Sequence, residues 1–237
     1  MEYSAEFLGS LGQFDADDWN SVCGGDYPFL RHEFLWGLEK TACTTAETGW
    51  QPCHLVIRQG DELIALMPLY LKSHSYGEYV FDWSWADAWR RSGLEYYPKL
   101  VTAIPFTPAT GPRLCVAAGV DSSAVWPVAL QAIQQFAQRQ GISSWHLLFP
   151  QEADSILLLE AGMHLIAIAG GTGEFPFLTK AERLRMAELA GKRIEGSNTK
   201  LCVHTSALIT AEAIEYSKHA QDCGADVLLV LPPYFEG

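Results

Sequence analysis

The sequence lacks any pair of cysteines in a C-x-x-C spacing, although it contains six cysteines in all. Zinc sites and disulfide frameworks need clustered or regularly paired cysteines, so neither is indicated and no metal centre is expected. The P-loop, the G-x-S-x-G motif and the glycine pattern of dinucleotide-binding folds are also absent. The chain therefore offers no standard phosphate, metal or serine-nucleophile site, and its cysteines are expected to be reduced thiols.

Long apolar runs and basic residues are scarce as well. No run approaches the roughly 18 to 20 apolar residues that a membrane-crossing helix needs, and Met1 to Glu6 lack the basic start of a secretory signal. A cytoplasmic protein without a membrane span is expected. Lys and Arg number 16 against 28 Asp and Glu, giving a net charge of −12. Such a surface repels phosphate backbones, so DNA is not expected as a partner.

What is present divides into two parts. With 237 residues, 49% of them hydrophobic, the chain can form one large domain or two small ones. All eight tryptophans precede residue 146, and residues 1–165 hold 9 Lys and Arg against 19 Asp and Glu, whereas residues 166–237 hold 7 against 9. This change of composition predicts two domains, 1–165 and 166–237.

The first part shows an alternating α/β pattern. Two extended runs, His54 to Gln59 and Glu62 to Leu71, flank a Gly-Asp pair and predict a hairpin. Tyr79 to Trp83 reads as a further strand. A proline-rich stretch then predicts a long loop, because proline is excluded from central strands and helix interiors; its prolines are Pro98, Pro105, Pro108 and Pro112. A helix that begins near Ser122 and ends at Gly141 completes a mixed sheet with flanking helices.

The second part reads as consecutive β/α units. Thr179 and Glu182 form a capping box, and Gly191 is expected to end that helix. Another helix follows from Thr210, after a weak strand, and Asp226 to Leu231 is an apolar run typical of a parallel sheet. The overall fold class is therefore predicted to be α/β, of the mixed α+β kind.

Several longer sequence segments in the first part resemble those of a known family. They are Pro28 to Leu35, Thr48 to Leu55, Pro68 to Asp82, Tyr96 to Leu100 and Pro105 to Leu114. In this order they resemble the N-terminal half of the FemAB-like family of peptidoglycan biosynthesis or recognition, over about residues 15–165. The resemblance implies a GNAT-like mixed sheet and an N-acyltransferase, with acyl-CoA or aminoacyl-tRNA as donor and an amine on a cell-wall precursor or small metabolite as acceptor. Family members are expected to continue into a second acetyltransferase-type half.

Candidate catalytic residues lie in the longest of these segments, Pro68 to Asp82. If the chain is extended there, alternation puts Glu78 and Asp82 on one face, and His74 lies nearby in sequence. A histidine beside a carboxylate can deprotonate the attacking amine in acyl transfer. The alternative is that His74 and Glu78 hold a loop through hydrogen bonds.

Candidate substrate-binding residues surround them. Lys72 and two tyrosines, Tyr76 and Tyr79, share the same stretch, and the tyrosines fit a core role equally well. Lys99 and Arg113, expected in loops, are suited to bind an acyl-carrier phosphate or a carboxylate. Pairing with surface acids is the alternative for both.

The second part contains two motifs, Gly170 to Phe175 and Leu231 to Tyr234. They resemble the dihydrodipicolinate synthase and N-acetylneuraminate lyase superfamily of (β/α)8 barrels, and within it the 5-dehydro-4-deoxyglucarate dehydratases. The resemblance implies a partial barrel fragment in which Thr172 and Tyr234 contribute to keto-acid binding. The alternative for Thr172 is a turn residue between glycines. It also places the Schiff-base lysine on strands that this sequence does not contain.

Three functional hypotheses follow. The first is an N-acyltransferase of the FemAB-like kind. The second is a non-catalytic chimeric or truncated protein, whose exposed sheet edges would favour a homo-oligomer. The third is a Schiff-base lyase or dehydratase that needs a missing part.

Overall fold

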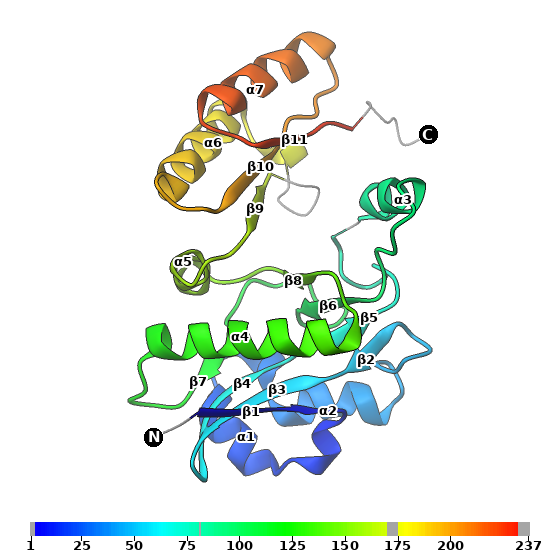
Figure 1. Ribbon diagram of the computed structural model, residues 1–237, viewed down its shortest axis with the longest axis vertical. Coiled ribbons are helices and arrows are strands. Elements are labelled where there is room, and N and C mark those ends of the chain that lie inside the picture. The colour runs from blue at the N-terminus through cyan, green and yellow to red at the C-terminus, as the bar shows by residue number, and fades with distance from the viewer. Residues whose placement is uncertain (1–2, 81, 170–174, 232–237) are drawn as a thin grey trace. The chain divides into compact units, whose positions relative to one another are not determined.

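The protein is described here by a computed structural model covering residues 3–80, 82–169 and 175–231. The chain forms two compact units, unit 1 (Met1–Leu157) and unit 2 (Leu158–Gly237). Unit 1 contains two four-stranded sheets and unit 2 a three-stranded sheet, each with helices (Figure 1). The predicted mixed α/β class is confirmed. Among the helices that the structure describes, none has the length and apolar character required to cross a membrane.

The first sheet of unit 1 is antiparallel, in the order β1-β3-β4-β7. Its strands are β1 (Tyr3–Leu8), β3 (His54–Gln59), β4 (Glu62–Met67) and β7 (Cys115–Val116). The predicted β3–β4 hairpin is present, and Gly60 supplies the positive φ of its turn, +61°.

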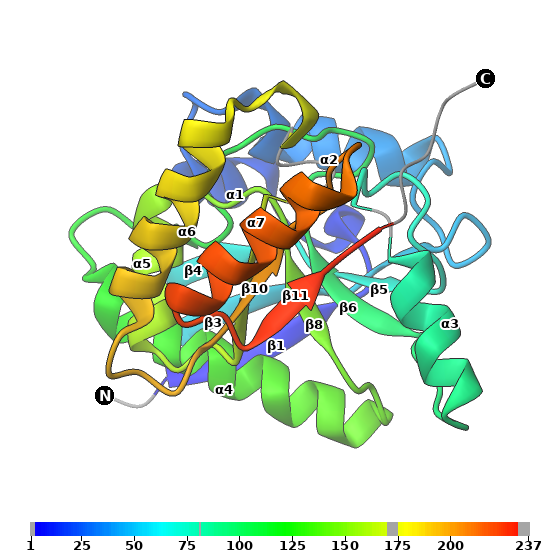
Figure 2. The same ribbon diagram turned by 90° about the horizontal axis from the view of Figure 1, so that it is seen from above.

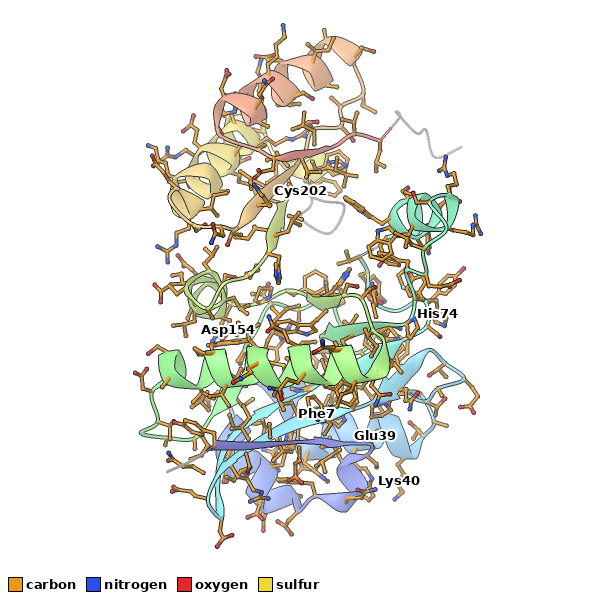
Figure 3. The ribbon with its side chains drawn as sticks, viewed as in Figure 1. Phe7, Glu39, Lys40, His74, Asp154 and Cys202 are labelled. Atoms are coloured by element: carbon orange, nitrogen blue, oxygen red, sulfur yellow. The ribbon has the colours of Figure 1, made fainter. Side chains whose placement is uncertain are left out.

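Helices cover both faces of this sheet (Figure 1). On one face lie the helices and 3₁₀ turns η1 (Leu11–Gln13), α1 (Ala16–Cys23), η2 (Pro28–Leu30) and α2 (His32–Lys40). Their buried Trp19 and Leu35 pack with Val56 and Leu66 of the sheet. On the other face lies α4 (Ser122–Gln140), which ends at the predicted glycine, Gly141. Phe7 and Phe136 stack there, with ring centroids 4.1 Å apart (Phe7 is labelled in Figure 3).

The second sheet of unit 1 holds two of the predicted site residues, Lys72 and Lys99. Its order is β2-β5-β6-β8, and the central β6 pairs antiparallel with β5 and parallel with β8. The elements are β2 (Trp50–Pro52), β5 (Tyr70–Lys72), α3 (Trp83–Arg91), β6 (Lys99–Thr102), β8 (Trp145–Leu147) and α5 (Glu152–Glu160).

Two expectations for this region are wrong. The stretch after Tyr79 is not a strand, because α3 begins at Trp83 with Asp82 as its N-cap residue; Phe81 lies outside the described residues. The proline-rich stretch is not all loop, because the central strand β6 runs through it. The four residues of β6 lie between Pro98 and Pro105. Neither proline is part of the strand, so neither removes an N–H donor from it.

Unit 2 is built from parallel β/α units. Its sheet has the order β11-β10-β9, with β9 (Leu165–Ile168), β10 (Lys200–His204) and β11 (Val227–Leu229) all parallel. The 3₁₀ turn η4 (Phe175–Phe177) precedes α6 (Lys180–Ile194), and α7 (Thr210–Asp222) follows β10. Both helices pack over the sheet (Figure 2), and buried side chains such as Ala187, Leu201 and Ala220 form the core between them. Within the described residues the three strands do not close into a barrel.

The capping box at the start of α6 is confirmed, but the predicted end of this helix is wrong. Thr179 Oγ1 accepts from Glu182 N, and the Glu182 carboxylate accepts from Thr179 N. The helix continues through Gly191 to Ile194. A Cβ at Gly191 would lie 2.1 Å from the carbonyl oxygen of Cys223, so this glycine permits close contact between α6 and the end of α7.

Gly191→Ala is therefore expected to destabilise unit 2, although alanine normally stabilises a helix interior by roughly 1 kcal/mol. Gly37→Ala in α2 is the matched control, because a Cβ there meets no atom within 4 Å. Urea unfolding followed by circular dichroism should show a lower midpoint for the first variant and an equal or higher one for the second. Equal behaviour of the two variants would contradict the close-contact role of Gly191.

Candidate functional site

The centre of the candidate site in unit 1 is Lys99, the first residue of β6. Its Nζ donates to Glu78 Oε2 at 2.8 Å and forms a second short ion pair with Asp82. All three residues are buried, with exposed fractions of 0% for Lys99, 2% for Glu78 and 5% for Asp82. The predicted proximity of Glu78 and Asp82 is thus present, but it arises from a shared lysine and not from alternation along a strand.

Two tyrosines complete the surroundings of Asp82. Tyr96 Oη donates to Asp82 Oδ2 at 2.8 Å, and Tyr97 Oη donates to Asp82 Oδ1 at 2.6 Å. Burial alone would raise the pKa of Asp82, but Lys99 and these hydrogen bonds outweigh it and hold the pKa below its usual value. Burial, with Asp82 close by, raises the pKa of both tyrosines. Asp82 is therefore a fixed anion that anchors Lys99.

Glu78 has a different environment, because only one of its oxygens is paired. Oε2 receives Lys99, whereas Oε1 is buried and has no hydrogen-bond partner among the described residues. Burial raises the pKa of Glu78, and the attraction of Lys99 offsets this only in part. A buried acceptor without a partner costs about 1 to 3 kcal/mol, so Oε1 is the atom most available to a substrate proton.

The carboxylate of Glu39 in α2, a residue labelled in Figure 3, has a contrasting environment. Its Oε1 lies 3.0 Å from His54 Nε2, and its Oε2 accepts from Ser10 Oγ at 2.6 Å and from Leu11 N at 3.0 Å. Burial would raise the pKa of Glu39, but His54 and Ser10 hold it below its usual value. Both oxygens of Glu39 are occupied, which fits a role in joining α2 to its neighbours.

Lys72, the last residue of β5, is the other buried lysine. Its Nζ donates to the carbonyl oxygen of Tyr76 at 3.1 Å and lies 3.7 Å from the ring centroid of Trp50. Burial lowers the pKa of Lys72 to about 7; Glu78 opposes this shift and Lys99 adds to it. Half of the Lys72 side chains thus carry a neutral amine near pH 7.

A turn between β5 and α3, residues 73–80, covers Lys72 and is called the covering turn; besides Glu78 it holds three predicted residues. Tyr76 and Tyr79 are 64% and 44% exposed, so they are surface side chains and do not fill a core. His74 Nδ1 accepts from Tyr76 N at 3.3 Å, and the two rings are in edge contact. Burial and the nearby Lys72 lower the pKa of His74. In the described part of the chain, the contacts of His74 include neither Glu78 nor Asp82.

Arg113 stands apart from this cluster. Its guanidinium donates to the carbonyl oxygens of Leu148, Pro112 and Ala109 at 2.7, 3.0 and 2.6 Å. These bonds fasten the loop that follows β6 to the segment after β8. Arg113 and Lys99 were predicted together as anion-binding loop residues, but the structure directs Arg113 to backbone carbonyls and places Lys99 in a strand against two buried acids.

Sequence reasoning missed Tyr96, Tyr97 and Trp50 as parts of the site. Tyr96 and Tyr97 immediately precede Pro98 and Lys99, and Trp50 opens the strand that pairs with β5. The available signal was that Tyr96 and Tyr97 share a family-like sequence segment with Lys99 and that Trp50 lies in another such segment. No group of three or more His, Cys, Asp and Glu side chains in the described ranges is arranged to hold a metal ion.

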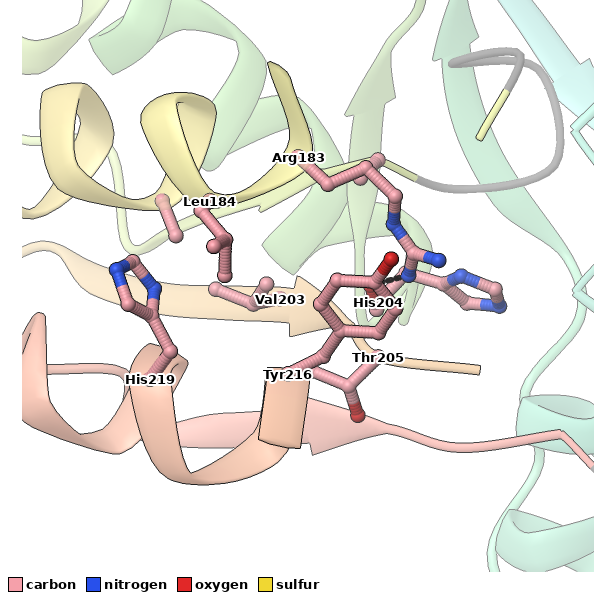
Figure 4. Close-up of a pocket in the computed structure, with 9 residues that line it drawn as sticks. Arg183, Leu184, Val203, His204, Thr205, Tyr216 and His219 are labelled. Carbon is pink, nitrogen blue, oxygen red and sulfur yellow. Dashed lines mark hydrogen bonds between the residues drawn. The ribbon is translucent and has the colours of Figure 1, made fainter. Parts of the chain in front are cut away.

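In unit 2, the predicted Thr172 and Tyr234 lie outside the described residues. Near the carboxyl end of β10, Arg183 donates to the carbonyl oxygens of Ser206 and His204 at 2.9 and 3.0 Å and stacks 4.0 Å from the ring centroid of Tyr216 (Figure 4). Burial and Arg183 lower the pKa of His204 to about 4. The adjacent cavity measures about 10 Å³, room for no more than a water molecule.

The Lys99 cluster should be essential for the stability of unit 1. Removing one partner from a buried ion pair costs about 3 to 5 kcal/mol, so Lys99→Met should lower the unfolding free energy strongly. Arg58→Met is the matched control, because Arg58 pairs with Glu6 at the surface, at 3.6 Å. Urea unfolding followed by tryptophan fluorescence reports on unit 1 alone, since every tryptophan lies there. A small loss for Lys99→Met would contradict the assigned role.

Lys72 should make the stability of unit 1 depend on pH. Its pKa is about 7 in the folded protein and 10.5 as the reference value. Between these values the unfolded state binds more protons, so this residue makes stability rise with pH, by at most about 1.4 kcal/mol per pH unit. Lys72→Met should flatten the rise of unfolding free energy between pH 7 and 10. Parallel curves for the two proteins would contradict the lowered pKa.

Two families match the chain in succession. The FemAB-like family, described as peptidoglycan biosynthesis/recognition, matches residues 10–168. The dihydrodipicolinate synthetase family matches residues 155–237. The two matches overlap around the boundary between unit 1 and unit 2.

The similar curated proteins concern the second segment. An uncharacterized DapA-like lyase of Thermococcus onnurineus is 42% identical over 78 residues, 33% of this chain and 26% of that protein. A 4-hydroxy-tetrahydrodipicolinate synthase of Corynebacterium urealyticum is 33% identical over 110 residues, 42% of this chain and 36% of that protein. The chain thus spans only about a quarter to a third of the length of these relatives.

Among solved structures, dihydrodipicolinate synthase from Aquifex aeolicus is 38% identical, covering 32% of this chain and 26% of that chain, with a TM-score of 0.31. The FemAB-like match, by contrast, extends over more than half of the sequence and includes the whole Lys72–Lys99 cluster. The chain belongs to the FemAB-like family, and this region is followed by a segment similar to the dihydrodipicolinate synthase family.

Proposed function

We propose that unit 1 is an N-acyltransferase domain of the FemAB-like kind, in which Glu78 accepts the proton of the attacking amine. The observation that supports this most is Glu78 Oε1, a buried carboxylate oxygen without a partner in the described residues. Burial raises the pKa of Glu78 above its usual value, and the higher proton affinity favours a role as general base. The opposite oxygen is fixed by Lys99, which orients the carboxylate.

The reaction needs one bond made and one broken. The acceptor amine attacks the carbonyl carbon of acyl-CoA or aminoacyl-tRNA, the new C–N bond forms, and the C–S or C–O bond to the carrier breaks. The ammonium proton passes to Glu78 Oε1, which returns it to the departing sulfur or oxygen, so that the carrier leaves as a thiol or hydroxyl. The acceptor is an amine on a cell-wall precursor or small metabolite, and His74 in the neighbouring turn is proposed as a second proton acceptor.

In this proposal, substrate reaches Glu78 when the covering turn opens. The Tyr76 carbonyl is held by Lys72 Nζ and by Trp50 Nε1, both at 3.1 Å. Phe106 N donates to the Gly77 carbonyl at 3.1 Å. Gly77 and Tyr79 have positive φ values, +77° and +61°, and such a conformation is strained for tyrosine. Opening this turn exposes Glu78, and closing it excludes water from the reacting amine.

Unit 2 offers no comparable support for lyase chemistry. A Schiff-base lysine is activated by desolvation in a buried pocket. All four lysines of this unit lie in its described residues and are exposed; they are Lys180, Lys192, Lys200 and Lys218. We therefore assign no reaction to unit 2.

The proposal predicts that Glu78→Gln lowers the rate of acyl transfer by about 100-fold, because a general base is lost while the side-chain shape is kept. The same variant should lose the fall in rate that the wild type shows as the pH decreases. The assay measures thiol release from acetyl-CoA, or transfer from labelled aminoacyl-tRNA, with a panel of amine acceptors and the full chain.

Glu62→Gln is the matched control, since Glu62 is an exposed glutamate on β4 of the same unit. It should retain full activity, and the tryptophan-fluorescence unfolding curve of Glu78→Gln should stay cooperative. Full activity of the folded Glu78→Gln protein would refute the role of Glu78. A folded wild-type chain that binds neither donor would refute the proposed function itself.

A further inference from the structure

Unit 1 holds two buried lysines with opposite electrostatic environments. Lys99 is paired with two carboxylates. Lys72 has no ion pair in the described part of the chain; its Nζ contacts the Tyr76 carbonyl and the Trp50 ring. The other five lysines of the sequence are exposed, and they are Lys40, Lys180, Lys192, Lys200 and Lys218. Among the seven lysines of the sequence, Lys72 is thus the one whose amine is buried and has no ion pair with a described residue.

This environment favours the neutral amine, which is the nucleophilic form. The cation loses water on burial, and this loss, together with repulsion by Lys99, outweighs the attraction of Glu78 and Asp82. With a pKa of about 7, roughly half of Lys72 is neutral at pH 7. An exposed lysine with an ordinary pKa has about one neutral amine in a thousand or fewer.

We propose that Lys72 is an internal acyl acceptor, modified by small acyl groups from a thioester donor when the covering turn opens. The Nζ lone pair attacks the thioester carbonyl, a C–N bond forms, and the C–S bond breaks. The ammonium proton passes to the unpaired Glu78 oxygen, which returns it to the departing sulfur, so that the carrier leaves as a thiol. The product is a stable amide, so this is a modification of the protein and not a turnover intermediate.

The surroundings of Lys72 limit the size of the acyl group. Nζ lies between the Trp50 ring and the covering turn, where a Cβ on Gly77 would already meet the Phe106 ring at 2.6 Å. An acetyl group is therefore favoured over longer chains. Acylation removes the positive charge that faces Trp50 but leaves one N–H that can still donate to the Tyr76 carbonyl.

The inference rests on the proposed function for the class of donor, but it needs no acceptor amine and is tested separately. The purified full chain is incubated with acetyl-CoA alone between pH 6 and 9, and peptide mass spectrometry follows the acetylation of each lysine. Lys72 should react at least about tenfold faster at pH 7 than the five exposed lysines, with a midpoint near pH 7, because of its larger neutral fraction. Lys99 should stay unmodified.

Three comparisons make the test decisive. Glu78→Gln should slow acetylation of Lys72 and leave that of Lys40 unchanged. Octanoyl-CoA should modify Lys72 much more slowly than acetyl-CoA. Acetylation of Lys72 at or below the rate of the exposed lysines overturns the inference, whatever the transfer assay shows. Modified Lys72 in a protein that transfers nothing to added amines would leave the inference standing and refute the proposed function.

Discussion

The organisation of unit 1 depends on the two ion pairs of Lys99. Lys99 begins the central strand of the second sheet, and its amine holds Glu78 and Asp82, which lie at the end of the covering turn and at the start of α3. Isolated buried charges are very costly, so a lysine in this position requires nearby acids and the acids require the lysine. One side chain thereby fixes a strand, a turn and a helix start.

The charged residues in and beside this cluster differ in their hydrogen-bond partners and in the direction of their pKa shifts. Asp82 accepts bonds from Lys99 and two tyrosines and remains an anion. Glu78 shares the lysine but keeps one oxygen unpaired, and Lys72 is buried beside the cluster without a carboxylate in contact. Burial pushes Glu78 toward its acid form and Lys72 toward its neutral form. A pair of groups whose pKa values move toward each other is suited to proton transfer near neutral pH.

Local signals in the sequence predicted local structure well. The Gly60 hairpin, the Gly141 helix end and the capping box of Thr179 each depend on neighbouring residues, and each is present. The expected strand after Tyr79 and the expected loop at Lys99 were wrong, because the buried ion pairs join residues about twenty positions apart. Gly191 was misread as a helix end because its partner, Cys223, is also distant in sequence. The family-like sequence segments contain the residues of the Lys72–Lys99 cluster, whereas the contacts among these residues join distant positions that no spacing rule predicts.

The central claim is that burial beside Lys99 leaves Lys72 with a weakly basic amine. The most direct measurement is an NMR titration of lysine side chains selectively labelled with ¹³C at Cε, with the Lys72 signal assigned from the Lys72→Met spectrum. The account predicts a midpoint near pH 7 for Lys72, while the exposed lysines titrate near their usual value. A Lys72 midpoint among those of the exposed lysines would contradict it.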